Sequence, residues 1–74
     1  VSGEAEDLHV IGSKARGEVI DQLTQRATAN AVAAGANEAS IIVVDVEEVD
    51  IPYMASETTR IRVRVVGDLA LGAA

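Results

Sequence analysis

The sequence predicts a small α+β domain in which one helix packs on a three-stranded sheet. Apolar residues recur at helical spacing over residues 14–34, and they alternate with polar residues over residues 40–51 and 59–66. A short turn region separates the two alternating segments, so we expect them to form a C-terminal antiparallel hairpin. With one short strand ahead of the helix, the order is strand, helix, strand, strand, which defines a two-layer βαββ domain.

The first strand is expected to be a short edge strand over residues 8–11. Residues 1–7 are small, polar and acidic, and we expect a flexible lead-in there; the Ala- and Gly-rich residues 71–74 are expected to form a flexible tail. Residues 8–70 are then a single domain. A strand followed by a helix and a parallel neighbour forms a right-handed crossover, so we expect the strands over 8–11 and 40–51 to be parallel neighbours.

The helix is the clearest element and is predicted over residues 14–34. Ser13 is its expected N-cap, and Gly35 lies where a left-handed C-terminal residue is favoured. One face is apolar at steps of three or four residues, with Val19 and Val32 at its edges; its members are Ile20, Leu23, Ala27, Ala31 and Ala34. The small alanines let the helix approach the sheet closely.

The hairpin carries an alternating pattern that changes phase within its first strand. Ile42, Val44 and Val46 are expected to face inward, and the next apolar residues, Val49 and Ile51, have the opposite parity. This change indicates a β-bulge near residues 47–48.

Three of the six cations of the chain lie at alternate positions of the last strand, which places Arg60, Arg62 and Arg64 on its polar face. Opposite charges across strands fix the register more than they stabilise the sheet. The expected cross-strand pairs are Ile51 with Ile61, Asp50 with Arg62, Val49 with Val63 and Glu48 with Arg64.

The size of the chain limits its stability. A domain of 74 residues buries only about 60% of the surface that its unfolded chain exposes. It contains no cysteine, and Tyr53 is its only aromatic residue, so the core is aliphatic and thin. We therefore expect self-association or packing on the rest of a longer protein, and the start at Val1 favours an excised piece of such a protein.

The composition also disfavours several classes of function. The net charge of −6 argues against nucleic acid and against anionic membrane surfaces as partners. The apolar runs are far shorter than the roughly 20 residues that cross a bilayer, and no signal peptide is visible, so a cytoplasmic location is expected.

No motif predicts catalysis, a cofactor or a metal. Gly12 and Gly17 have the spacing of a phosphate-binding loop, but Glu18 and Val19 stand where that motif needs Lys and Ser or Thr. Lys14 and Arg16 near the helix start favour either an anion site or a solvated first turn.

For the remaining polar residues, a structural role is favoured over metal binding or catalysis. His9 is the only histidine and has no cysteine to complete a zinc site, so a strand histidine is expected. The acidic residues 45, 47, 48 and 50 alternate along a strand instead of converging in a loop, so a charge-paired face is favoured over a calcium or magnesium site. Tyr53 and Met54, beside Pro52, either contact another surface or pack locally on the sheet edge.

Four segments resemble the C-terminal region of hydantoinase/oxoprolinase family proteins: Gly-Glu-Val-Ile-Asp (17–21), Ala-Val-Ala-Ala-Gly-Ala-Asn (31–37), Val-Val-Asp-Val-Glu-Glu-Val (43–49) and Thr-Arg-Ile-Arg-Val-Arg-Val-Val-Gly-Asp-Leu (59–69). The family includes N-methylhydantoinase, 5-oxoprolinase and acetone carboxylase-like enzymes. The resemblance departs at the turn, where the family often has a Leu-Pro-Gly-Asn-like sequence after the tyrosine and this chain has Met-Ala-Ser-Glu (54–57).

The resemblance implies a non-catalytic accessory or assembly domain, whose parent is an ATP-dependent enzyme that opens cyclic amides or carboxylates ketones. The chain alone is then expected to be inactive, with Tyr53, Met54, Arg60, Arg62 and Arg64 as possible interaction residues. One alternative is a stand-alone oligomer that binds a ligand between its subunits, as the flavin-binding dodecins do with the same order of elements. Another is an enzyme whose site is shared across a subunit interface, with His9 paired to a carboxylate.

Overall fold

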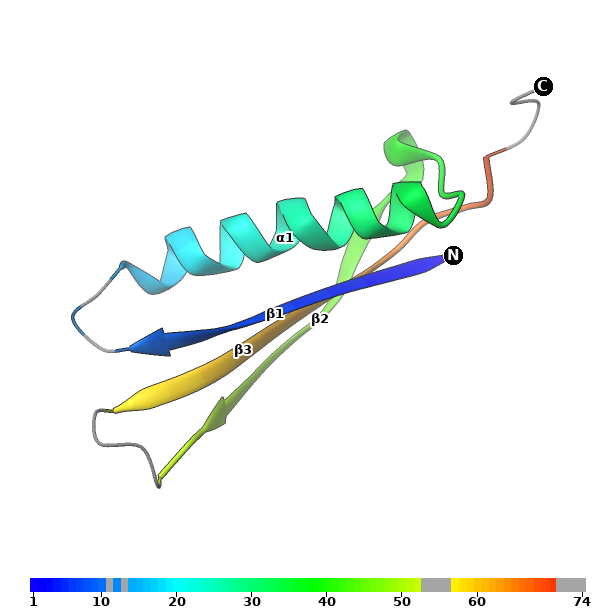
Figure 1. The fold of residues 1–74 in the computed structure, drawn as a ribbon. Coiled ribbons are helices and arrows are strands. Elements are labelled where there is room, and N and C mark those ends of the chain that lie inside the picture. Colours follow the sequence, from blue (N-terminus) through cyan, green and yellow to red (C-terminus); the bar gives the residue numbers. More distant parts are fainter. Residues whose placement is uncertain (11, 13, 53–56, 71–74) are drawn as a thin grey trace.

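The computed structural model describes residues 1–10, 12, 14–52 and 57–70. Its elements are strand β1 (Ser2–Val10), helix α1 (Arg16–Ala33), the short 3₁₀ helix η1 (Glu38–Ser40), strand β2 (Ile42–Asp50) and strand β3 (Thr58–Val66). Figure 1 shows helix α1 lying along one face of the three-stranded sheet. The predicted α+β class and the βαββ order are confirmed.

The sheet has the order β1-β3-β2, and both pairings are antiparallel. β1 and β2 therefore run in the same direction but are not neighbours, so the expected parallel pair is wrong. The central place of β3 has an electrostatic reason, because its outward arginines then lie between two acidic strands. Arg64 is opposite Glu4 on β1 and Asp45 on β2, and Arg62 is opposite Glu6 and Glu47 in the same way.

β1 begins at Ser2 instead of near residue 8, so the expected flexible lead-in is also wrong. Gly3 and Ala5 are the buried residues of this strand, and both are too small to produce an apolar pattern in the sequence. The helix requires such small residues. A Cβ atom on Gly3 would lie 2.2 Å from the carbonyl oxygen of Ala27 and 2.6 Å from the backbone nitrogen of Ala31.

The helix runs over 16–33, close to its predicted bounds, and buries Val19, Leu23, Ala27 and Ala31. This stripe advances by four residues at each step, so the predicted face was rotated slightly: Ile20 is partly buried, whereas Val32 and Ala34 are exposed. The N-cap residue is Ala15, which supplies no side-chain hydrogen bond, instead of the expected Ser13.

The predicted role of Gly35 at the helix C-terminus is confirmed. Its φ is 109°, its N–H donates to the carbonyl of Val32 (3.0 Å), and the N–H of Ala36 donates to the carbonyl of Ala31 (3.0 Å). These two bonds define a Schellman motif, in which a glycine with positive φ lets the chain reverse and satisfy the last helical carbonyls.

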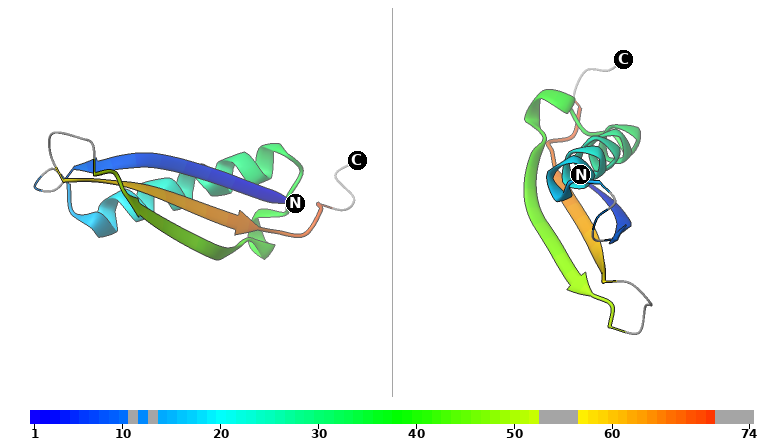
Figure 2. Two further views of the ribbon diagram at one scale, coloured as in Figure 1. Left: turned by 90° about the horizontal axis from the view of Figure 1, so that it is seen from below. Right: turned by 90° about the vertical axis from the view of Figure 1, so that its left-hand side faces the viewer.

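The core lies between α1 and only two of the three strands. Its buried apolar residues are Ala5, Val19, Leu23, Ala27, Ala31, Ala36, Ile61, Val63 and Val65, and none of them belongs to β2. The helix packs on β1 and β3, and the right-hand view of Figure 2 shows β2 curving away from it. The expected thin aliphatic core is thus built on one side of the sheet, and β2 is left uncovered.

The hairpin register differs from the expected one by three residues. The bulge lies between Val43 and Asp45, not near residues 47–48. Glu47 is opposite Arg62 and Glu48 is opposite Ile61, where we expected Glu48 opposite Arg64. Since an odd shift exchanges the two faces of a strand, Val49 lies on the arginine side. The hairpin closes where the N–H of Ile51 donates to the carbonyl of Thr58 (2.9 Å), nearer the turn than the sequence pattern implied.

Candidate functional site

The predicted interaction residues of β3 form a row along the sheet face that α1 does not cover. Arg62 Nη2 lies 3.1 Å from Glu47 Oε2, and Arg60 lies 3.8 Å from Glu6 and 3.9 Å from Glu47. At the other end, Arg64 lies 3.9 Å from Glu4. Exposed ion pairs of this kind stabilise little, typically below about 1 kcal/mol each. The row therefore acts mainly to set the pairing of the strands, and its charges are matched within the chain.

β2 is the least covered element of the fold. Its apolar side chains are 39% to 64% exposed; they are Ile42, Val43, Val44, Val46 and Val49. Val43 and Val46 are opposite the buried Val65 and Val63 of β3, so they lie on the helix side of the sheet, yet they remain exposed. Ile42 and Val49 lie on the opposite side. Apolar surface is thus exposed on both faces of one edge strand, an arrangement that marks interaction sites or aggregation hazards.

The two edge strands of the sheet, β1 and β2, differ in whether side chains hydrogen-bond to their backbone. On β1, Asn30 Nδ2 of the helix donates to the carbonyl of Glu4 (2.8 Å), and Asp7 Oδ1 accepts from the N–H of Leu8 (2.8 Å). Side chains of the same chain therefore hydrogen-bond to one backbone N–H group and one backbone carbonyl group along the β1 edge. Among the described residues, no side chain makes such a bond to the backbone of residues 42–50. The β2 edge is open to another strand, whereas the β1 edge is partly closed.

A shallow groove of about 590 Å³ follows the flank of α1 next to η1. Its lining is mostly small or apolar, and it consists of Thr24, Gln25, Thr28, Ala29, Val32, Ala33 and Glu38.

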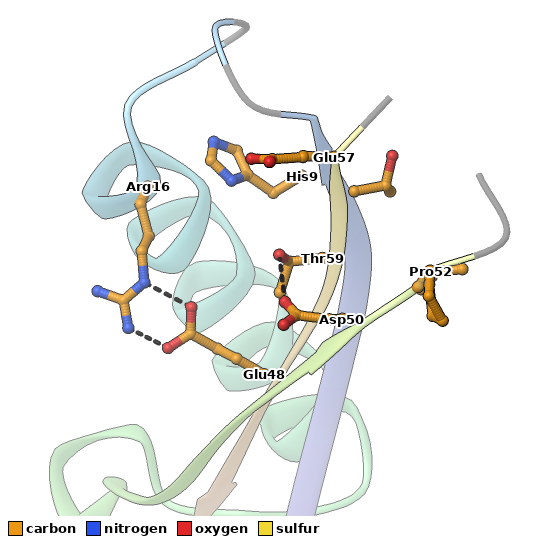
Figure 3. Close-up of a pocket in the computed structure, with 9 residues that line it drawn as sticks. His9, Arg16, Glu48, Asp50, Pro52, Glu57 and Thr59 are labelled. Carbon is orange, nitrogen blue, oxygen red and sulfur yellow. Dashed lines mark hydrogen bonds and ion pairs between the residues drawn. The ribbon is translucent and has the colours of Figure 1, made fainter. Parts of the chain in front are cut away.

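A second hollow, of about 540 Å³, lies at the hairpin end, where the polar candidates of the sequence meet (Figure 3). Arg16 donates from Nε and Nη2 to the two carboxylate oxygens of Glu48. Thr59 Oγ1 donates to Asp50 Oδ1 (3.2 Å). His9 Nε2 lies 2.7 Å from the carbonyl oxygen of Lys14, so this nitrogen carries the hydrogen and donates it.

The electrostatics of this hollow favour fixed charges over proton transfer. The hydrogen bonds from Arg16 hold the pKa of Glu48 below its ordinary value against desolvation, and the positive charge of Arg16 acts in the same direction. The same hydrogen bonds and charge raise the pKa of Arg16. A general base needs a pKa near the working pH, which for a carboxylate means a raised pKa. An ion pair with an arginine lowers the pKa of a carboxylate instead. The pair is thus a link between α1 and β2.

The two cations that the sequence suggested for an anion site interact with neighbouring side chains of the fold. Lys14 Nζ lies 3.5 Å from Gln22 Oε1 of the helix, while Arg16, its expected partner in an anion site, is paired with Glu48. No group of three or more potential metal ligands occurs within the part of the chain that the structure describes. Tyr53 and Met54 lie outside the described residues.

The exposed strand β2 was not predicted as a functional feature. Its signal in the sequence is the run of four apolar residues over 41–44, which breaks the alternation of a half-buried strand. An antiparallel sheet with one covered face shows a clean alternation, so such a run indicates a strand that meets apolar surroundings on both faces. Ile41 packs against the core, whereas Ile42, Val43 and Val44 are exposed.

Comparisons with protein-family models, with curated proteins and with solved structures give no match for this chain. Among the described residues, no helix is long and apolar enough to cross a membrane.

Proposed function

We propose that this chain is a non-catalytic assembly domain that docks through β2 onto the rest of a longer protein of the hydantoinase/oxoprolinase type. The observation that carries the proposal is the exposure of β2, whose apolar residues face solvent on both sides while the helix covers only β1 and β3. An uncovered strand of this kind gains stability when a second surface closes over it.

The non-catalytic part of the proposal is supported by the hairpin hollow. Five of its polar side chains hydrogen-bond to one another or to the backbone: Arg16 to Glu48, Thr59 to Asp50, and His9 to a carbonyl. The pKa of the Glu48 carboxyl is displaced downward, away from the range that acid–base catalysis uses.

The identity of the parent rests on the resemblance of the four segments to hydantoinase/oxoprolinase proteins. Two of these segments form the C-terminal part of α1 with its cap and the middle of β2, and the longest is β3 with its exit. The parent would be a cytoplasmic, ATP-dependent enzyme that opens cyclic amides or carboxylates ketones, and this domain would contribute to its packing or subunit contacts.

A binding experiment tests the proposal. The purified chain is titrated into the ATPase body of a hydantoinase/oxoprolinase protein from which the corresponding C-terminal region has been removed. We expect a 1:1 complex by calorimetry, and weaker binding of the Val46→Gln variant. The control is Leu8→Gln, which makes a similar exchange at an exposed apolar residue of β1 and should bind as the wild type does.

Two results would overturn this function. One is hydrolysis of ATP by the purified chain alone, above the level of a heat-denatured sample. The other is equal binding of wild type and Val46→Gln, because β2 would then not be the docking element.

The groove on α1 favours a second candidate, a small oligomer that holds a flat ligand between its subunits. The order of elements is that of the dodecins, and the groove has a mostly small or apolar lining and a volume of about 590 Å³. Its lining contains no aromatic side chain to stack on a flavin. Quenching of riboflavin fluorescence by the purified chain at micromolar concentration would support this candidate, and unchanged fluorescence would remove it.

A further inference from the structure

We infer that the free edge of β2 accepts an extended segment in which basic and apolar residues alternate, so that the sheet gains a fourth strand. This inference rests on the proposed docking role of β2 and adds the chemistry of the partner. Its three supports are the direction of the backbone groups along the edge, the side chains on the two faces, and the charge pattern that disfavours a second copy of the chain.

The backbone of the edge is arranged to receive a strand. The N–H of Ile51 donates to Thr58, and in an antiparallel ladder the residues that bond to the partner alternate with those that point away. Counting back from Ile51, the groups of Val49 and Glu47 face β3, and those of Val46, Glu48 and Asp50 face outward. This gives a row of donors and acceptors to which an extended peptide can add, as in β-augmentation.

The side chains next to that edge specify the partner. On the face away from the helix, Asp45 and Glu47 are exposed or half-exposed carboxylates at alternate positions. The side chain of Asp45 has no ion pair or hydrogen bond with a described residue, although it is opposite Arg64. On the helix side, Val46 is exposed, and the carboxylates of Glu48 and Asp50 on the same face are already hydrogen-bonded to Arg16 and Thr59. A partner strand therefore needs basic residues on one face and an apolar residue beside Val46 on the other.

β3 already shows that such a strand fits β2. It places Arg62 and Arg64 opposite Glu47 and Asp45, and Val63 opposite Val46. The new partner would repeat this pattern on the other side of β2, and each acidic residue of the outer face would then lie between two basic neighbours. Opposite charges directly across strands stabilise the pairing, and like charges destabilise it.

A second copy of β2 is a poor occupant of this edge. A closed dimer pairs the two strands antiparallel about a twofold axis, and Asp45 and Glu47 share one face while Glu48 and Asp50 share the other. Every register that overlaps residues 45–50 and keeps the faces matched places two carboxylates opposite each other. The possible pairs are Asp45 with itself or Glu47, Glu47 with itself, Glu48 with itself or Asp50, and Asp50 with itself.

The test uses a peptide with the sequence of β3, Thr-Thr-Arg-Ile-Arg-Val-Arg-Val-Val (58–66), titrated into the ¹⁵N-labelled full chain. We expect amide shift changes along residues 43–50 and a dissociation constant that rises with salt, as for any exposed charge pairing. A second peptide, in which the three arginines are replaced by glutamate, should leave these amides unchanged.

Two charge-neutralising variants distinguish specific binding of the peptide at the β2 edge from non-specific attraction to a chain of net charge −6. Asp45→Asn should weaken binding of the arginine peptide about two- to fivefold, the range that one cross-strand charge pair provides. Asp21→Asn removes the same charge from an exposed position of α1 and should not change the affinity.

Several outcomes would overturn the inference: equal binding of the two peptides, shift changes on β1 or α1 instead of β2, or equal effects of the two variants. Concentration-dependent dimerisation with protection of β2 would contradict the basic partner but would keep the docking role. ATP hydrolysis by the chain would remove the proposed function without affecting peptide binding.

Discussion

Arg16, at the start of α1, donates two side-chain hydrogen bonds to the carboxylate of Glu48 on β2. This pair joins the helix to the strand that it does not cover, across the hairpin hollow in Figure 3. Both side chains are accessible to solvent, at 58% and 33% exposure, so water and salt weaken the attraction. The pair orients β2 relative to α1 and contributes only modestly to the stability of the fold.

The pair makes the stability of the fold depend on pH. The pKa of Glu48 is lowered in the folded state, so its contribution is present above the pKa of an unfolded glutamate and is lost as the pH falls through the lower, folded value. We expect the side-chain ¹³C resonance of Glu48 to titrate below the range of a free glutamate. In the Arg16→Gln variant the midpoint should rise, and an unchanged midpoint would contradict the pairing.

Gly3 should be intolerant of any side chain. In Gly3→Ala the new methyl group would meet the backbone of Ala27 and Ala31, and the helix would have to move away from β1. We expect a loss of about 1–3 kcal/mol in the free energy of unfolding, the usual range for overpacking. The control is Gly17→Ala, where the methyl group meets nothing within 4 Å. Urea denaturation of both variants measures the difference, and equal midpoints would show that the helix does not lie this close to β1.

Leu23 should contribute most of the helix side of the core. It is 1% exposed and is the largest fully buried side chain of α1. Leu23→Ala is expected to cost about 2–5 kcal/mol through lost burial and a cavity. The matched control is Val32→Ala on the exposed side of the helix, which should change stability by less than about 0.5 kcal/mol. Comparable losses in the two variants would mean that the helix is rotated from its observed orientation.

Gly35 should be required at the helix C-terminus for its backbone conformation. An L-residue with φ near 109° is strained, so Gly35→Ala is expected to destabilise by about 1–2 kcal/mol. Thermal unfolding followed by circular dichroism measures this loss. A variant as stable as the wild type would indicate that the Schellman turn is not formed in solution.

The sequence predicts the elements that have strong periodic patterns. The helix around Leu23 and its glycine cap depend on local spacing, and both are confirmed. The arginines do lie opposite carboxylates, but Arg62 and Arg64 are opposite Glu47 and Asp45 instead of the expected Asp50 and Glu48. The start of β1 was missed because Gly3 and Ala5 are small enough to lie under a helix and give no apolar signal. Their role depends on tertiary packing, which local patterns do not encode.

The register of the hairpin was missed for a related reason. We assumed that the apolar residues Val49 and Ile51 of this segment faced a core, but β2 has no buried residue, so its valines do not report one inward face. The bulge then lies between Val43 and Asp45, inside the apolar run. The candidate docking edge was hidden by the same assumption, because exposure on both faces of a strand is a property of the folded sheet.

Amide hydrogen exchange along β2 of the chain alone tests the central claim, an open strand edge, most directly. We expect the outward N–H groups of Val46 and Glu48 to exchange at rates close to those of an unstructured peptide, and the N–H groups of Glu47 and Val49 to be protected by β3. Alternating protection of this kind at every protein concentration would support an unpaired strand edge. Uniform protection of residues 45–50 in the isolated chain would contradict it, since the edge would then already be paired.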